Sequence, residues 1–184
     1  EMQATREENQ VRASVAFDAA LWAHVRFAIS NKTRAFVHAL TGSLFASAPQ
    51  CAPETRRYYQ HLSRFSAAFA FLADVSMLVL GGSLKRREKL SARLGDALAY
   101  MYLAACTLKR FEDEGRQRDD LPLLDWAVQD ALARIQGAFE GILANFPNRL
   151  VGTALRWVIF PLGQWFAPPS DALGHRVAGL LIAP

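Results

Sequence analysis

Apolar residues recur along most of the chain at spacings of three, four and seven positions, which is the pattern of one face of an α-helix. This pattern predicts helices over about residues 14–40, 55–80, 83–114 and 121–145. No segment alternates apolar and polar residues long enough to predict a strand. Four long helices with short connections predict an all-α fold, an antiparallel bundle with a shorter C-terminal helical appendage.

Turn and cap residues divide these predicted helices. Gly81 is expected to close the second helix in a left-handed conformation, and Ser83 to accept the first free N–H groups of the third. Gly115 is expected to end the third helix and Asp120 to cap the fourth. Pro147 then ends the fourth helix, because the residue before a proline is driven out of the helical region.

The C-terminal part of the chain is the most apolar. Residues 150–166 are apolar almost all round, and Pro161 is expected to kink them. Two prolines then break the chain, and Ser170 with Asp171 offers a cap for a short helix over 171–182.

Length and composition agree with one domain over residues 1–184. Of the 184 residues 52% are hydrophobic and 21% charged, which is typical of a globular protein with one sizeable core. Since the chain begins with Glu1 rather than Met, we expect a fragment of a longer protein. The chain itself divides into an N-terminal helix and linker (1–54), core bundle helices (55–146) and apolar C-terminal helices (147–184).

Familiar catalytic and metal-binding motifs do not occur in the sequence. It holds no Glu-x-x-His, Gly-x-Ser-x-Gly, Gly-x-Gly-x-x-Gly or phosphate-loop motif. The four histidines are isolated and are interpreted as capped or core-edge side chains, and the acidic run 112–114 as a solvated surface feature. Cys51 and Cys106 suggest a reducing, cytoplasmic compartment, with Cys106 a small core residue. We therefore predict no catalytic, cofactor-binding or metal-binding residue.

The turn between the second and third helices is a candidate anion site. Ser83, Lys85 and Arg86 join a helix start to basic side chains, which could hold a phosphate of a coenzyme or lipid headgroup. The alternative, which we favour, is a turn with solvated cations, because successive cations cannot all face one side of a helix. A net charge of +4 spread among acidic residues is weak evidence for nucleic acid, and we expect no nucleic-acid partner.

Two segments raise the question of a membrane. Residues 65–84 approach spanning length with Asp74 as their one charge, but we interpret them as a buried bundle helix. Trp157, Phe160 and Trp165 are candidate membrane or partner contacts, because aromatic residues beside arginines suit an interfacial anchor. Burial against the bundle or a neighbouring domain is the favoured alternative.

Several blocks of sequence follow one another in a specific order. They include LSRFSAAFA (62–70), LGGSLKRREKLSARLGD (80–96), LKRFEDEG (108–115), WAVQDAL (126–132), NFPNR (145–149), IFPLG (159–163) and PSDALGHRVA (169–178). Together they resemble the C-terminal region of bacterial FadE-type acyl-coenzyme A dehydrogenases.

The resemblance implies a function for the protein to which this chain belongs. That family uses tightly bound FAD to take two hydrogens from the Cα–Cβ bond of an acyl-CoA, the first step of fatty-acid β-oxidation. An upstream core would hold the FAD and the catalytic glutamate, so this accessory domain is expected to be inactive alone. The chain is also similar to the extra helical domain of very-long-chain acyl-CoA dehydrogenases, which implies a homo-oligomer and peripheral contact with the inner membrane. The alternative is a non-catalytic membrane-docking or oligomerisation module.

Overall fold

The computed structural model describes residues 33, 36–44 and 46–182, and within these ranges the chain forms helices and no strand. The all-α prediction is therefore confirmed. Most of the predicted first helix lies outside the described residues, although residues 36–40 are helical. The long helices are α2 (Pro53–Leu80), α3 (Glu88–Asp113) and α4 (Leu121–Ala144), and the shorter ones are α5 (Arg149–Ile159) and α6 (Asp171–Ile182).

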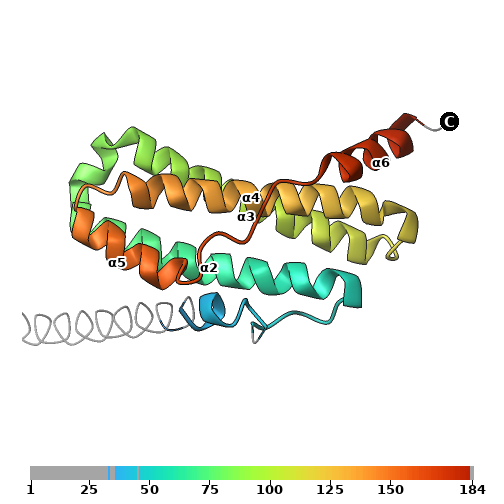
Figure 1. The fold of residues 1–184 in the computed structure, drawn as a ribbon, viewed down its shortest axis with the longest axis horizontal. Helices are drawn as coiled ribbons and strands as arrows, with labels where there is room; N and C mark the ends of the chain where they lie inside the picture. Colours follow the sequence, from blue (N-terminus) through green and yellow to red (C-terminus); the bar gives the residue numbers. More distant parts are fainter. Residues whose placement is uncertain (1–32, 34–35, 45, 183–184) are drawn as a thin grey trace, which may run out of the picture.

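The long helices lie antiparallel along one axis (Figure 1). α3 packs most extensively against α4, α5 packs against α4, and α6 projects beyond the far end of the bundle. The core forms where the apolar faces meet, and the rings of Phe65 and Phe139 touch edge-on with centroids 5.6 Å apart. Burying one such side chain contributes about 1.5–3 kcal/mol. The other large, fully buried side chains include Leu72, Leu108, Leu132, Ile135 and Ile142.

The third helix begins at Glu88, not at Ser83 as predicted. A 3-10 turn, η1 (Gly81–Arg86), comes first, and the Ser83 hydroxyl donates to the Leu80 carbonyl at 2.6 Å instead of capping α3. Serine hydroxyls commonly bond an upstream carbonyl in this way where the backbone turns. Gly81 has the expected positive φ of 49°, but its ψ of −132° is not that of the left-handed helix.

The cap predicted for the fourth helix is also wrong. Asp120 ends a second 3-10 turn, η2 (Arg118–Asp120), and its carboxylate makes no capping hydrogen bond. Pro122 occupies the first turn of α4, where its missing N–H costs no helical bond. The Ser170 hydroxyl accepts from the Leu173 N–H at 3.3 Å, which confirms the cap of α6.

The start of α2 is capped from another helix. Glu112 near the end of α3 accepts the Ala52 N–H at 3.0 Å, the Thr55 hydroxyl and the Arg116 Nε at 2.7 Å. Burial raises the pKa of Glu112, but these hydrogen bonds and the Arg116 charge outweigh it and lower the pKa overall. Glu112 is thus not the solvated surface residue that we predicted, whereas Asp113 pairs with Lys109 in the open.

The predicted apolar stretch over 150–166 divides into two parts. α5 ends at Ile159, so Pro161 follows a helix rather than kinking one. Asn148, which the sequence analysis did not single out, caps α5 by accepting the Leu150 N–H at 3.0 Å and the Val151 N–H at 3.3 Å. Residues 160–170 then run without regular structure across the bundle to α6 (Figure 1), and we call them the C-terminal strap.

Gln136 of α4 holds the C-terminal strap through its side-chain amide. The amide oxygen accepts the backbone N–H groups of Trp165 (3.0 Å) and Phe166 (3.1 Å), and the amide nitrogen donates to the Phe166 carbonyl at 3.2 Å. Gln136 itself is buried. Gln136 thus pairs three backbone polar groups of a strap whose other residues are mostly exposed.

Candidate functional site

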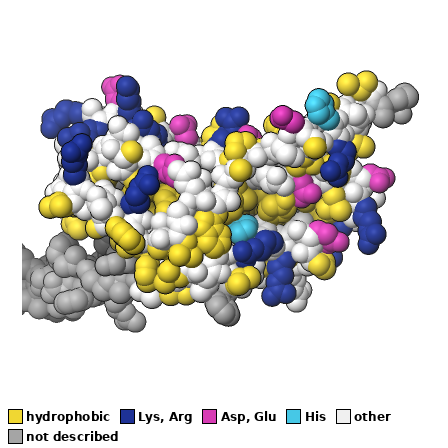
Figure 2. Space-filling view, in the orientation of Figure 1, with side chains coloured by type: hydrophobic (Ala, Val, Ile, Leu, Met, Phe, Trp, Pro, Cys, Tyr) yellow, Lys and Arg dark blue, Asp and Glu magenta, His cyan; other side chains and the backbone are white. Residues whose placement is uncertain are grey.

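Basic side chains gather at the end of the bundle where η1 meets α3 and α4, on the left in Figure 2. A cavity of about 470 Å³ lies there. We call it the basic pocket, and it is lined by Arg86, Arg87, Glu88, Lys89, Leu90, Arg93 and Asn145. Of the predicted anion contacts, Arg86 lines this pocket, whereas Ser83 and Lys85 do not.

Arg93 forms the wall of the basic pocket nearest α4. A Cβ placed on Gly141 would lie 2.7 Å from the Arg93 Nε and 3.0 Å from its Cδ. The Arg93 side chain therefore crosses α4 at Gly141, which has no side chain of its own. The Asn145 amide next to it donates to the Gly141 carbonyl at 2.8 Å. Within the described residues, the four cations of the pocket join no ion pair. The pairs are Lys109–Asp113, Arg110–Glu114, Arg116–Glu112 and Arg134–Asp130.

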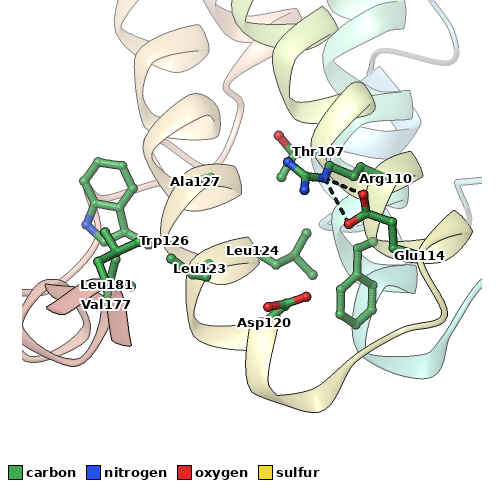
Figure 3. A pocket seen from close by; sticks show the side chains of 11 residues that line it. Thr107, Arg110, Glu114, Asp120, Leu123, Leu124, Trp126, Ala127, Val177 and Leu181 are labelled. Atoms are coloured by element: carbon green, nitrogen blue, oxygen red, sulfur yellow. Dashed lines mark hydrogen bonds and ion pairs between the residues drawn. The ribbon is translucent and has the colours of Figure 1, made fainter. Parts of the chain in front are cut away.

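A second cavity, of about 450 Å³, lies at the opposite end of the bundle between α3, α4 and α6 (Figure 3). Its walls are mainly apolar, with Leu123 and Leu124 from α4 and Val177 and Leu181 from α6. The ion pair between Arg110 and Glu114, with 2.9 Å between Nε and Oε1, lies at its edge. Because three elements build this cavity, no single stretch of sequence signals it.

A cluster of basic groups lies beneath the C-terminal strap. Arg64 is 2% exposed, donates to the Ile159 carbonyl at 3.3 Å, and has its guanidinium carbon 5.6 Å from the Trp165 ring centroid and 5.8 Å from that of Phe166. Burial, with Arg57 as a second cause, lowers the pKa of Arg64 to about 10. Burial likewise lowers the pKa of His61 to about 4, with Arg57 and Arg64 adding to the effect. Both groups anchor the strap through ring contacts rather than facing a cavity.

Aromatic residues near α5 occupy different environments. Trp157 is 67% exposed, whereas Phe160 is 6% exposed and belongs to the core, so the structure does not support a surface role for Phe160. Trp165 is 44% exposed, and its indole N–H donates to the Leu162 carbonyl at 3.2 Å. Figure 2 shows hydrophobic side chains over the lower left of the molecule, where α5 lies.

The apolar second helix packs one side into the bundle. By length and composition Pro53–Arg86 could cross a membrane, a property that core helices of water-soluble proteins share. Phe65 and Leu72 are fully buried, but only 22% of the most apolar window of this segment is buried and Leu78 is 85% exposed. The segment is therefore a bundle helix with one open side, not the buried helix that we predicted.

The histidines and cysteines form no metal-binding cluster within the described residues. The described residues hold no group of three or more His, Cys, Asp or Glu that could bind a metal ion. His61 is half-buried, His175 is exposed, and His24 lies outside the described residues. Cys106 is exposed on α3, contrary to our prediction, because that helix turns the neighbouring Ala104 and not Cys106 into the bundle.

Comparison with protein families gives a match over the whole chain. The family model described as "Acyl-CoA dehydrogenase, C-terminal, bacterial type" matches residues 1–184. No solved structure matches this chain.

Proposed function

Because the chain belongs to the bacterial-type acyl-CoA dehydrogenase C-terminal family, we propose that it is the accessory helical domain of a FAD-dependent acyl-CoA dehydrogenase. The whole enzyme would oxidise an acyl-CoA to a trans-2-enoyl-CoA in the first step of fatty-acid β-oxidation. The observation that carries this proposal is the family match along the full length of the chain. We place the enzyme in the cytoplasm, with peripheral contact at the inner membrane.

In this proposal the upstream core holds the FAD and the proton-abstracting glutamate. The domain described here would act through its surfaces instead. Its buried basic groups, Arg64 and His61, support this division, because they contact the strap and its aromatic rings. Its exposed features are the basic pocket, the apolar cavity beside α6 and the outer face of α5.

Three proteins test the proposed function: the full-length enzyme, the upstream core without this domain, and residues 1–184 alone. We expect the full-length enzyme to bind FAD and to reduce an electron-accepting dye with palmitoyl-CoA. Residues 1–184 should bind no FAD and show no turnover. A full-length enzyme whose flavin is not reduced by any acyl-CoA would overturn the assignment, and turnover by residues 1–184 would overturn the division of roles.

The outer face of α5 supports a second role in oligomerisation or membrane docking. Leu150 is 83% exposed and Trp157 67% exposed on a helix that turns Leu155 and Ile159 inward. Exposed apolar side chains grouped on one helix face are typical of a contact surface. We propose that this face contacts a second subunit, with the membrane as the alternative outcome.

Trp157→Ser in the full-length enzyme tests this role, with Trp126→Ser at the other end of the bundle as the matched control. Light scattering should show a smaller assembly for Trp157→Ser and an unchanged one for Trp126→Ser. Loss of vesicle flotation with an unchanged mass would assign the face to the membrane. If neither mass nor flotation differs between the two variants, α5 does not form the contact.

A further inference from the structure

We propose that the basic pocket binds a phosphate group carrying two negative charges, such as a phosphomonoester or pyrophosphate. This inference does not depend on the dehydrogenase assignment, because it rests on the charges, the shape and the packing of this one cavity. No part of the proposed accessory role requires a bound phosphate.

The basic pocket gathers cations from both sides of the bend between η1 and α3. η1 ends at Arg86, and Arg87 has φ −102° and ψ 65°, so the chain bends before α3 begins. Lys89 and Arg93 then lie four positions apart on one face of α3. All four side chains line one cavity, whereas on an uninterrupted helix Arg87 would point about 100° away from Arg86.

The charge of the basic pocket is not balanced within the described part of the chain. Four cationic side chains line it with one carboxylate, that of Glu88, and the four join no ion pair there. Like charges that line one cavity repel one another, and a bound dianion would relieve that repulsion. A cavity of about 470 Å³ is within the size range of small-molecule sites.

Arg93 packs against the bare backbone of α4 at Gly141. Its side chain passes over Gly141 so closely that an alanine Cβ there would lie 2.7 Å from its Nε. The position of Arg93 therefore depends on a residue that carries no charge. The paired N–H groups of a guanidinium match two phosphate oxygens.

The phosphate could belong to a soluble metabolite or to a lipid headgroup. Leu78 and Leu150 are more than four-fifths exposed, at 85% and 83%. They lie near the end of α2 and the start of α5, which Figure 1 places at the same end of the bundle as η1. The shared chemistry is the doubly charged phosphate, and separate arms of one experiment distinguish its sources.

The experiment uses the full-length enzyme and titrates pyrophosphate by calorimetry at 0.15 M NaCl. We expect saturable binding that Arg93→Gln weakens at least tenfold. Gly141→Ala should also weaken it severalfold, because the new Cβ displaces Arg93 without changing any charge. Arg134→Gln is the matched control, because it removes one surface cation from α4 away from the pocket and should leave the affinity unchanged.

Vesicles of phosphatidylcholine supply the second arm, with either phosphatidic acid, which carries a phosphomonoester, or phosphatidylglycerol at equal surface charge. If the enzyme prefers vesicles with phosphatidic acid and pyrophosphate abolishes that preference, the phosphate belongs to a lipid headgroup. If the enzyme binds pyrophosphate but no vesicles, the ligand is soluble.

Far-UV circular dichroism checks the fold of each variant, and Arg93→Lys keeps the charge if Arg93→Gln fails to fold. Absence of saturable binding in both arms, or an equal loss in Arg134→Gln, would overturn the proposal while leaving acyl-CoA oxidation untouched.

Discussion

His61 couples the attachment of the strap to pH. Its ring meets that of Phe166 edge-on with centroids 4.9 Å apart, and burial beside Arg57 and Arg64 lowers its pKa to about 4. In the unfolded chain a histidine titrates near 6.5. Between these two values the unfolded state binds a proton that the folded state does not, so the fold loses stability as the pH falls through this window.

We therefore expect the free energy of unfolding to decrease by about 1–2 kcal/mol between pH 7 and pH 5 on account of His61. Urea denaturation at the two pH values measures this difference. His61→Gln should remove most of it, whereas His175→Gln, which changes an exposed histidine, should retain it. A pH dependence that survives in His61→Gln would show that another group is responsible.

Glu112 allows a second test at a single side chain, because it caps a helix to which it does not belong. Glu112→Ala removes the acceptor of the Ala52 N–H and of the Thr55 hydroxyl, and we expect a loss of about 1–2 kcal/mol in unfolding free energy. Glu114→Ala, two positions away, removes an exposed ion pair and should change stability far less. Equal effects in chemical denaturation would contradict the capping role.

The spacing of apolar residues predicted which stretches form helices, whereas contacts between elements determine where several of these helices begin and end. The apolar stripe of the fourth predicted helix is buried in α4 at Leu124, Val128 and Ile135. The cap of α2 could not be predicted locally, since Ala52 and Glu112 are 60 positions apart. Similarly, the sequence pointed to Arg86 but not to Arg93 or Asn145, because three separate elements meet to form the basic pocket.

Two glycines in helices should respond oppositely to the same substitution. A Cβ on Gly152 of α5 would lie 2.9 Å from the Leu143 carbonyl oxygen and 3.0 Å from the Phe146 Cβ, so Gly152→Ala should cost about 1–3 kcal/mol. Gly137 of α4 faces open space, and Gly137→Ala should gain about 0.5–1 kcal/mol from helix propensity. Denaturant midpoints measure both, and a neutral Gly152→Ala would show that α5 shifts away from α4.

Over the whole molecule, stability is expected to vary from one end of the bundle to the other. Within the described part of the chain, α6 buries one side chain, Leu173, and leaves Leu181 and Ile182 71% and 81% exposed. α5 buries three residues despite its similar length. Segments with few buried contacts open at a lower free energy.

Hydrogen exchange tests this gradient. Backbone amides of α6 should exchange at least tenfold faster than those of α5, and those of α4 should be the slowest. Mass spectrometry of peptides from the full-length enzyme measures all three, with residues 1–184 alone for comparison. Protection of α6 equal to that of α4 in both proteins would contradict the gradient, whereas protection of α6 in the full-length enzyme alone would indicate that the upstream core covers it.

The C-terminal strap also bears on how the domain is made on the ribosome. Synthesis runs from the N-terminus, so α2, α3 and α4 emerge before the segment that packs over Arg64 and Phe65. Until residues 160–166 leave the exit tunnel, Gln136 has no strap backbone to bind, and the Phe65 ring lacks its contact with Phe166. A nascent chain exposing such a surface is a substrate for chaperones. A segment synthesised after α2, α3 and α4 is thus the one that covers part of their apolar face.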